Sequence, residues 1–244
     1  MNNGFDKVHQ PCPLCNSSDA VGINTDGSAK CFSCGEFMPD YNKLFNGESV
    51  METTTKKSSY DNPVGQGTFA DLTDRRISKA TAQKYGVTSL HDKAGDVIQH
   101  FYPYYNGHEL SATKTRYSKD KRFYLSGSFE NTGLFGQQLF KQAKYITITE
   151  GECDAMATYE LLGSKWAVVS IKRGSAGAEK DVKESLEFLE QFENIIIAFD
   201  NDKAGKEASV KVARLFKPAK CKIMTMPNGW KDPNDMLKNN KHKE

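Results

Sequence analysis

Three carboxylates within five residues raise the question of what this chain does: Glu150, Glu152 and Asp154 follow directly on the apolar stretch YITIT. Like charges at this spacing repel one another, and each carboxylate resists the loss of its water. The group could form the acidic first turn of a helix, where negative charge favours the positive end of the helix dipole. It could instead bind a hard cation.

A second acidic pair favours the cation. Asp200 and Asp202 follow the apolar run NIIIAF. If both runs are strands of one parallel sheet, their carboxyl ends meet at the same edge, where ligands of such sheets bind. The donors are carboxylate oxygens, which favours Mg²⁺ or Mn²⁺ over zinc. Two such ions about 3.5–4 Å apart can stabilise the attacking and leaving oxygens of a phosphoryl transfer.

The elements that must position these carboxylates alternate between strand and helix. The apolar runs predict strands at 145–149, 166–171, 194–200 and 221–227. The stretches between them predict helices at 154–163, 179–192 and 202–216. Runs of Ile, Val and Ala this apolar are typical of strands buried on both faces. We therefore predict an α/β domain with a mainly parallel sheet covered on both sides.

A metal site of a different kind is predicted near the N-terminus. Two C-x-x-C pairs, fifteen residues apart, are formed by Cys12, Cys15, Cys31 and Cys34. In a reducing compartment this spacing indicates one structural zinc ion held by four thiolates. So short a segment buries little apolar surface, so the metal would supply much of its folding energy. Cys153 and Cys221 lack such partners and are predicted to be core thiols.

Between these two regions the sequence predicts a linker and then a basic segment. Residues 41–67 are polar and have the composition of a flexible linker. Residues 74–87 predict a short helix capped by Gly86, and Asn106-Gly107 predicts a β-hairpin. Five cations follow, interleaved with Tyr117, Phe123 and Tyr124: Lys114, Arg116, Lys119, Lys121 and Arg122. Cations mixed with aromatics suit a nucleotide or nucleic-acid surface, although a solvated loop at the end of a strand remains the alternative.

Another possible phosphate site lies after the strand predicted at 166–171. Lys172 and Arg173 precede a glycine-containing loop at 174–177, whose backbone amides could hold phosphate. A glycine loop after a strand is often only a turn.

Composition and charge are those of a soluble globular protein. No apolar run approaches the roughly 20 residues of a membrane span, and the N-terminus lacks the apolar stretch of a signal peptide. We therefore expect a cytosolic protein with no membrane partner. Residues 149–202 carry a net charge of −7, between 53–148 with +6 and 203–244 with +7. This segregation suits a polyanion that metal ions bridge to carboxylates.

Two motifs carry a family resemblance. TEGECDAMA and FDNDKAGKEA resemble the Toprim signature, which occurs in primases, topoisomerases and some nucleases and repair proteins. The order of four-cysteine ribbon, linker, basic segment, LFG at 134–136 and Toprim resembles the primase half of bacteriophage primase–helicases. This resemblance implies four parts: a zinc ribbon at 1–40, a linker at 41–67, a basic α+β subdomain at 68–140 and a Toprim subdomain at 141–244.

The resemblance also implies roles for the residues. Glu150 would bind metal and could act as general base. Asp200 and Asp202 would bind two catalytic Mg²⁺ or Mn²⁺ ions. Asp154 and Asp232 would provide two further carboxylates at the site. The chain would then be a DNA primase that makes short RNA primers on single-stranded DNA from ribonucleoside triphosphates. Its partners would be a replicative helicase, fused or separate, and a DNA polymerase that receives the primer. It would act in the cytoplasm of an infected bacterial cell.

The sequence departs from the family pattern in two places. Family members carry a histidine after an Asp-Gly pair in the ribbon, and here Ser28 follows Asp26 and Gly27, with Lys30 close by. A serine cannot stack or titrate as imidazole does, so these residues would read a different template triplet. No G-x-x-x-x-G-K-[ST] motif is present, so we expect either a chain that ends at the primase boundary or a separate helicase.

Other Toprim proteins offer rival functions. A non-catalytic recombination mediator combines a Toprim domain with a four-cysteine zinc site, but places the zinc site inside the chain after a helical hairpin. A Toprim nuclease is a further alternative, which the ribbon disfavours. A topoisomerase would need more chain than 244 residues.

Overall fold

The structure is a computed structural model that describes residues 5–14, 17–33, 36–38, 40–42, 67–119 and 122–239, apart from the side chain of Asn228. The chain divides into two compact units, residues 1–56 and 57–244, and each is described by itself. Most of the linker predicted at 41–67 lies outside the described residues.

The N-terminal unit is a small antiparallel sheet in the order β1-β2-β3-β4. Its strands are Lys7–Gln10, Val21–Ile23, Ala29–Cys31 and Phe37–Met38. Cys12 and Cys31 are buried in one small core with Val21, Met38 and Tyr41. The Tyr41 hydroxyl donates to the carbonyl of Pro11 at 2.8 Å. The ribbon therefore extends past its predicted end at residue 40, because the first residue of the predicted linker belongs to this core.

The second unit contains an antiparallel sheet in the order β5-β6-β7-β8. Its strands are Thr88–His91, Val97–Asn106, Glu109–Tyr117 and Phe123–Gly127. The helical elements before it are η1 (Thr73–Arg75) and α2 (Lys79–Tyr85), and Gly86 caps α2 at a φ of 73°, as predicted. The predicted hairpin forms, but Asn106 pairs with Glu109, so its two-residue loop is Gly107-His108, one position later than predicted.

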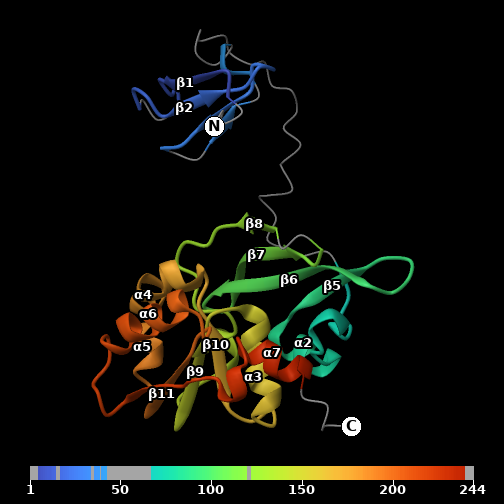
Figure 1. Cartoon of the computed structure of the whole chain (residues 1–244), viewed down its shortest axis with the longest axis vertical. Helices are drawn as coiled ribbons and strands as arrows, with labels where there is room; N and C mark the ends of the chain where they lie inside the picture. Colours follow the sequence, from blue (N-terminus) through green and yellow to red (C-terminus); the bar gives the residue numbers. More distant parts are fainter. Residues whose placement is uncertain are drawn as a thin grey trace. The chain divides into compact units, whose positions relative to one another are not determined.

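The second sheet is entirely parallel, in the order β10-β9-β11-β12. Its strands are Tyr145–Thr149 (β9), Ala167–Ser170 (β10), Asn194–Ala198 (β11) and Cys221–Ile223 (β12). The helices are α3 (Glu152–Leu161), α4 (Gly174–Glu184), α5 (Leu186–Leu189), α6 (Lys203–Ala213) and α7 (Pro233–Asn239), with short turns η2 (Gln137–Leu139) and η3 (Pro227–Gly229). Figure 1 shows α4, α5 and α6 on one side of the sheet and α3 and α7 on the other. The predicted α/β layering is confirmed.

Two predicted segments differ from the structure. The helix expected at 179–192 is broken at Ser185 into α4 and α5, and α4 begins five residues early, at Gly174. The loop predicted at 174–177 is therefore the first turn of α4. The reason is local: Gly174 adopts a φ of 66°, and the Asp181 carboxylate accepts the backbone N–H groups of Lys172 at 2.6 Å and Arg173 at 2.9 Å.

The two faces of the parallel sheet bury separate cores. One core packs β9, β10 and β11 against α4, α5 and α6. The other contains Tyr85, Tyr102, Tyr104, Phe135 and Met156, from α2, β6, the LFG motif and α3. The Tyr85 hydroxyl donates to the Val168 carbonyl at 2.9 Å, and its ring stacks on Phe135. The antiparallel sheet and one face of the parallel sheet therefore share a core.

No helix in the described ranges is both long enough and apolar enough to cross a membrane.

Candidate active site

A cleft of about 910 Å³ is lined by the antiparallel sheet and by loops at the carboxyl ends of the parallel strands. Its acidic side carries Glu150, Asp154, Asp200 and Asp232. The antiparallel sheet contributes Tyr102, Lys114, Arg116, Phe123 and Leu125 to its lining, and further cations come from the loops of the parallel sheet. The carboxyl end of a parallel sheet is where ligands of α/β proteins bind.

Glu150 and Asp200 come together because their strands are neighbours. β9 pairs with β11 up to Thr149 and Ala198, so the residues that follow leave the sheet at the same edge. Burial and the nearby charge of Asp200 raise the pKa of Glu150. Its Oε1 accepts the backbone N–H of Ser175 at 3.2 Å, while its Oε2 is buried with no hydrogen-bond partner among the described residues. A buried oxygen without a hydrogen-bond partner destabilises the folded protein unless a bound ligand contacts it.

Asp154 and Asp232 add to the same acidic cluster. Burial and the charge of Asp232, together with Cys153 and Asp200, raise the pKa of Asp154 well above its ordinary value. The backbone N–H of Asn234 donates to Asp154 at 3.2 Å. The structure therefore brings four of the predicted acids into the lining of one cleft, from the loops after β9 and β11, from α3 and from the turn before α7.

Asp202 is placed differently from its predicted partners. It is exposed and caps α6, with its Oδ1 accepting the N–H of Gly205 at 2.9 Å, and it is not among the residues that line the cleft. Gly205 packs closely on Asp200, since a Cβ there would lie 2.3 Å from the Asp200 carbonyl oxygen. The glycine of the D-x-D-x-A-G element thus lets α6 approach Asp200 and fix its backbone.

Of the three clustered carboxylates, Glu152 has a structural role. Its buried Oε1 accepts the Tyr104 hydroxyl at 2.5 Å and the Lys114 ammonium at 2.7 Å. It therefore joins α3 to β6 and β7, and of the three carboxylates only Glu150 and Asp154 belong to the acidic cluster.

Several predicted phosphate-binding cations have internal partners. The Lys172 side chain is 1% exposed, and its ammonium donates to the Thr132 carbonyl at 2.6 Å and to Glu184 at 3.1 Å. Arg173 pairs with Asp181 and Glu184. Lys172 is therefore held by internal partners in this fold, and its predicted phosphate role stays a prediction. The predicted glycine loop beside it is helical, as described above.

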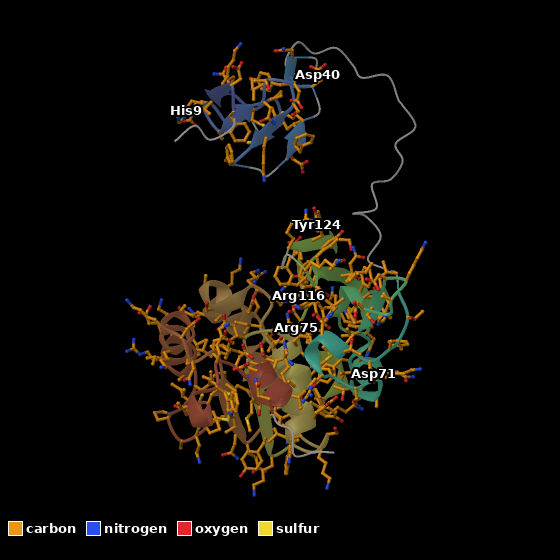
Figure 2. All side chains as sticks on the ribbon, turned by 45° about the vertical axis from the view of Figure 1, so that its right-hand side comes forward. His9, Asp40, Asp71, Arg75, Arg116 and Tyr124 are labelled. Carbon is orange, nitrogen blue, oxygen red and sulfur yellow. The ribbon has the colours of Figure 1, made fainter. Side chains whose placement is uncertain are left out.

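Arg116 stands out among the remaining basic residues. It is buried in the wall of the cleft, and its Nη1 finds no hydrogen-bond acceptor in the part of the chain that the structure describes. Lys119 is exposed, Lys121 lies outside the described residues, and the Arg122 guanidinium lies 5.4 Å from the centre of the Tyr117 ring. Figure 2 labels Arg116 together with Arg75, a second arginine that lines the cleft.

The sequence prediction missed Arg75 and Lys231. The Lys231 ammonium lies 3.0 Å from Asp200 Oδ2 and 3.7 Å from Asp232 Oδ2, so it neutralises part of the acidic cluster. Its position next to Asp232 in KDPND was a usable signal. Arg75 donates to Asn234 at 3.3 Å, a contact between residues 159 positions apart that no local pattern reveals.

The predicted residues of the N-terminal unit are only partly described. Cys12 and Cys31 are buried in one core, but Cys15 and Cys34 lie outside the described residues. The Ser28 hydroxyl and N–H both donate to Asp26 Oδ1, at 2.6 and 2.9 Å, and Ser28 is buried. Lys30 is exposed on β3. Of the three predicted template-reading residues, Asp26 and Lys30 thus face solvent, while Ser28 is held in a local turn.

A buried histidine beside the cleft predicts a pH dependence of stability. Burial opposes the charge of His100, but the hydrogen bond to Asp74 at 3.0 Å and contacts with Cys153 raise its pKa from 6.5 to about 9. The folded state thus binds the proton more tightly than the unfolded state. This contribution to stability is fully present below pH 6.5 and is lost as the pH rises through about 9.

We therefore expect the melting temperature to fall by several degrees between pH 6.5 and 9.5. In Asp74→Asn, which lacks the charged partner, the melting temperature should be lower at pH 6.5 and change less over this range. Parallel melting curves for the two proteins across the range would contradict this account of His100.

Comparison with known proteins agrees with this arrangement. Residues 147–237 match the Toprim-like family. The crystal structure of the primase fragment of the bacteriophage T7 primase–helicase is 31% identical, with a TM-score of 0.66, over 96% of this chain and 95% of that chain. This chain belongs to the DNA primases, as the primase portion of the phage primase–helicase family.

Two further relatives give the family its context. The DNA helicase/primase of Enterobacteria phage T3 is 35% identical over 93% of this chain, and the chain spans 40% of that protein's length. A T7 structure shows the lagging-strand DNA polymerase with primase domains of two subunits bound to an RNA/DNA hybrid and dTTP. Its matching chain is 34% identical, with a TM-score of 0.63, over 71% of this chain and 86% of that one.

The acidic side of the cleft has the donors that a hard divalent cation prefers. All are carboxylate oxygens, and one of them, Glu150 Oε2, is buried without a partner among the described residues. Across the described ranges, no three His, Cys, Asp or Glu side chains stand close enough to hold one ion as they are oriented. The residues fit such an ion in type, and their side chains would have to turn toward it.

Proposed function

We propose that this chain synthesises short RNA primers on single-stranded DNA by metal-dependent nucleotidyl transfer. The observation that carries the proposal is the buried Oε2 of Glu150, which has no hydrogen-bond partner among the described residues and belongs to a side chain that lines one cleft with Asp200 and several cations. A site lined by both carboxylates and cations suits a triphosphate held between metal ions and arginine. Membership of the DNA primases supports RNA primer synthesis as the reaction.

The proposed roles follow from the positions of the residues. Glu150, Asp200 and Asp202 would hold Mg²⁺ or Mn²⁺, with Asp154 and Asp232 as further acids. The ions, when bound, would supply charge neutralisation at the α-phosphate and at the leaving pyrophosphate. Asp202, as the α6 cap, would contribute its free oxygen after a side-chain rotation. Glu150, whose pKa is raised by burial and by Asp200, is suited to take the proton of the attacking 3′-hydroxyl.

The N-terminal unit is proposed to bind one structural zinc ion and to read the template. Burial of Cys12 and Cys31 in one core supports four-thiolate binding with Cys15 and Cys34. Asp26 and Lys30 are the exposed candidates for contact with template bases, because Ser28 donates its hydroxyl within its own turn. The proposed division is a zinc ribbon at 1–40, a linker at 41–67, a basic subdomain at 68–140 and a Toprim subdomain at 141–244, with Tyr41 packed in the core of the ribbon.

The proposed partners follow from the relatives. The phage T3 relative is a helicase/primase, which supports a helicase as partner, fused or separate. The T7 polymerase structure supports handover of the primer to a DNA polymerase. The substrates would be single-stranded DNA and ribonucleoside triphosphates, in the cytoplasm of an infected bacterium.

One assay separates this proposal from its rivals. The full chain is incubated with single-stranded DNA, labelled ribonucleoside triphosphates and Mg²⁺ or Mn²⁺, and the products are resolved by size. A primase yields oligoribonucleotides that require both template and metal. Shortened DNA would indicate a nuclease, and bound but unchanged DNA without RNA products would indicate a recombination mediator.

A further inference from the structure

A lysine in the turn before α7 pairs with two carboxylates of the acidic cluster. The Lys231 ammonium lies 3.0 Å from Asp200 Oδ2 and 3.7 Å from Asp232 Oδ2. The other oxygen of Asp232, Oδ1, accepts the backbone N–H of Asp235 at 2.7 Å, so Oδ2 is the oxygen that this residue presents to a cation. The ammonium therefore lies at carboxylate oxygens that a divalent cation would use.

The backbone of Lys231 is fixed, whereas its side chain is 62% exposed. Its carbonyl accepts the N–H of Asn201 at 2.8 Å, and its N–H donates to Asp235 Oδ2 at 3.3 Å. The Asn201 side-chain amide also donates to the Trp230 carbonyl at 3.2 Å, which ties the loop after β11 to the turn before α7. A long, exposed side chain on a fixed backbone can turn its ammonium into solvent without a change in fold.

This ammonium and a divalent cation would compete for the same oxygen. Mg²⁺ binds carboxylate oxygens at about 2.0–2.1 Å, so an Mg²⁺ ion on Asp200 Oδ2 would lie within about 5 Å of an ammonium that stays 3.0 Å from that oxygen. Two cations this close repel each other, and the divalent ion has twice the charge with which to attract the carboxylates. The ammonium is therefore the cation that leaves.

We infer that the Lys231 ammonium occupies part of the divalent-cation site in the metal-free protein and leaves Asp200 when metal binds. The inference rests on the proposed function, since it concerns the metal site of that reaction. Exposure of the side chain supports it: Lys172, which is held by internal partners, is 1% exposed and also donates to a backbone carbonyl. Lys231 is thus a positioning residue that neutralises the empty site and sets the metal concentration that fills it.

The first test measures Mn²⁺ binding to the full chain without template, from the electron spin resonance signal of free Mn²⁺. Lys231→Met keeps the length of the side chain and removes its charge. We expect its Kd for Mn²⁺ to fall at least about threefold, as when an ion pair of surface strength no longer opposes binding. Lys231→Arg keeps the charge and should bind Mn²⁺ no more tightly than wild type.

The matched control is Lys203→Met, which removes a 92% exposed cation of α6 that lies 4.0 Å from Glu207. Its Kd for Mn²⁺ should stay within about 1.5-fold of wild type at physiological salt, because salt screens exposed charges. An unchanged or weaker affinity in Lys231→Met would overturn the inference, since a lysine that stays on Asp200 would support the metal site. An equal gain in Lys203→Met would overturn it as well.

Melting temperatures give a second, independent measurement. Without metal, Lys231→Met should melt about 2 °C or more below wild type, because the acidic cluster has lost a counter-charge. With saturating Mn²⁺ the two proteins should melt together, because Lys231 no longer contacts Asp200 in either. A difference that persists in saturating Mn²⁺ would show that Lys231 stays in place, contrary to the inference.

The inference and the proposed function can fail separately. If the wild-type chain makes RNA primers and Lys231→Met binds Mn²⁺ as wild type does, only the inference fails. If the wild-type chain makes no RNA, yet Lys231→Met binds Mn²⁺ more tightly, only the proposed function fails. Absence of Mn²⁺ binding in both proteins would contradict both.

Discussion

Replacing Glu150 by glutamine is expected to lower the rate of dinucleotide synthesis by a factor of about 1,000 or more while the protein stays folded. Glutamine has the same shape but cannot carry the negative charge that binds a cation or accept the proton of the 3′-hydroxyl. Quenched-flow or gel assays with two ribonucleotides, template and Mg²⁺ measure the rate, and circular dichroism reports the fold.

The stability of this variant distinguishes a functional carboxylate from a structural one. Burial and the charge of Asp200 raise the pKa of Glu150, so the ionised carboxylate destabilises the folded protein when no metal is bound. Glu150→Gln should therefore melt at the same temperature as wild type or higher. The matched control is Glu207→Gln, an exposed carboxylate on α6 near Lys203, which should keep full activity. Normal synthesis by Glu150→Gln would remove the basis of the polymerase assignment.

Replacing Cys31 by serine is expected to abolish primer initiation on single-stranded DNA. Cys31 is fully buried beside Cys12, and a serine hydroxyl is a poor substitute for a thiolate zinc ligand. The unit would lose its zinc and most of its folding energy. Because residues 57–244 form a separate compact unit, extension of a supplied RNA primer should persist in part.

Two measurements check this prediction. Zinc content should fall from one ion per chain to none, and the ratio of initiation to extension should fall at least about tenfold. Cys221→Ser is the control, since this half-buried thiol lies on β12 in the other unit. Equal loss of initiation and extension in Cys31→Ser would show that the ribbon and the polymerase unit do not act separately.

The sequence predicted the parallel sheet well because its signal is local and redundant. Each of the strands β9, β10 and β11 is a short apolar run followed by a helical pattern, and the rule for parallel sheets places the ends of β9 and β11 at one edge. The convergence of Glu150 and Asp200 followed from that topology alone. Boundaries were less accurate at 174–189, where hydrogen bonds from Asp181 decide how α4 begins.

The residue pattern along the sequence could not predict which side chains contact each other in the fold. Glu152 resembled its acidic neighbours in sequence, yet Tyr104 and Lys114 turn it into a buried link between sheets. The pattern predicts phosphate binding for Lys172, but it does not reveal that Thr132 and Glu184 hold the Lys172 ammonium. Such roles depend on partners from 12 to 48 positions away, and a charge pattern along one segment does not contain them.

The aromatic core between α3 and the antiparallel sheet limits how primases of this kind can be recombined. A fragment that begins at residue 141 would lack the rings of Tyr85 and Phe135, which pack in one core with Val168 and Met156. Its parallel sheet would therefore expose a hydrophobic surface to water. Hybrid enzymes are therefore best joined ahead of residue 67, so that both walls of the cleft are inherited from one parent.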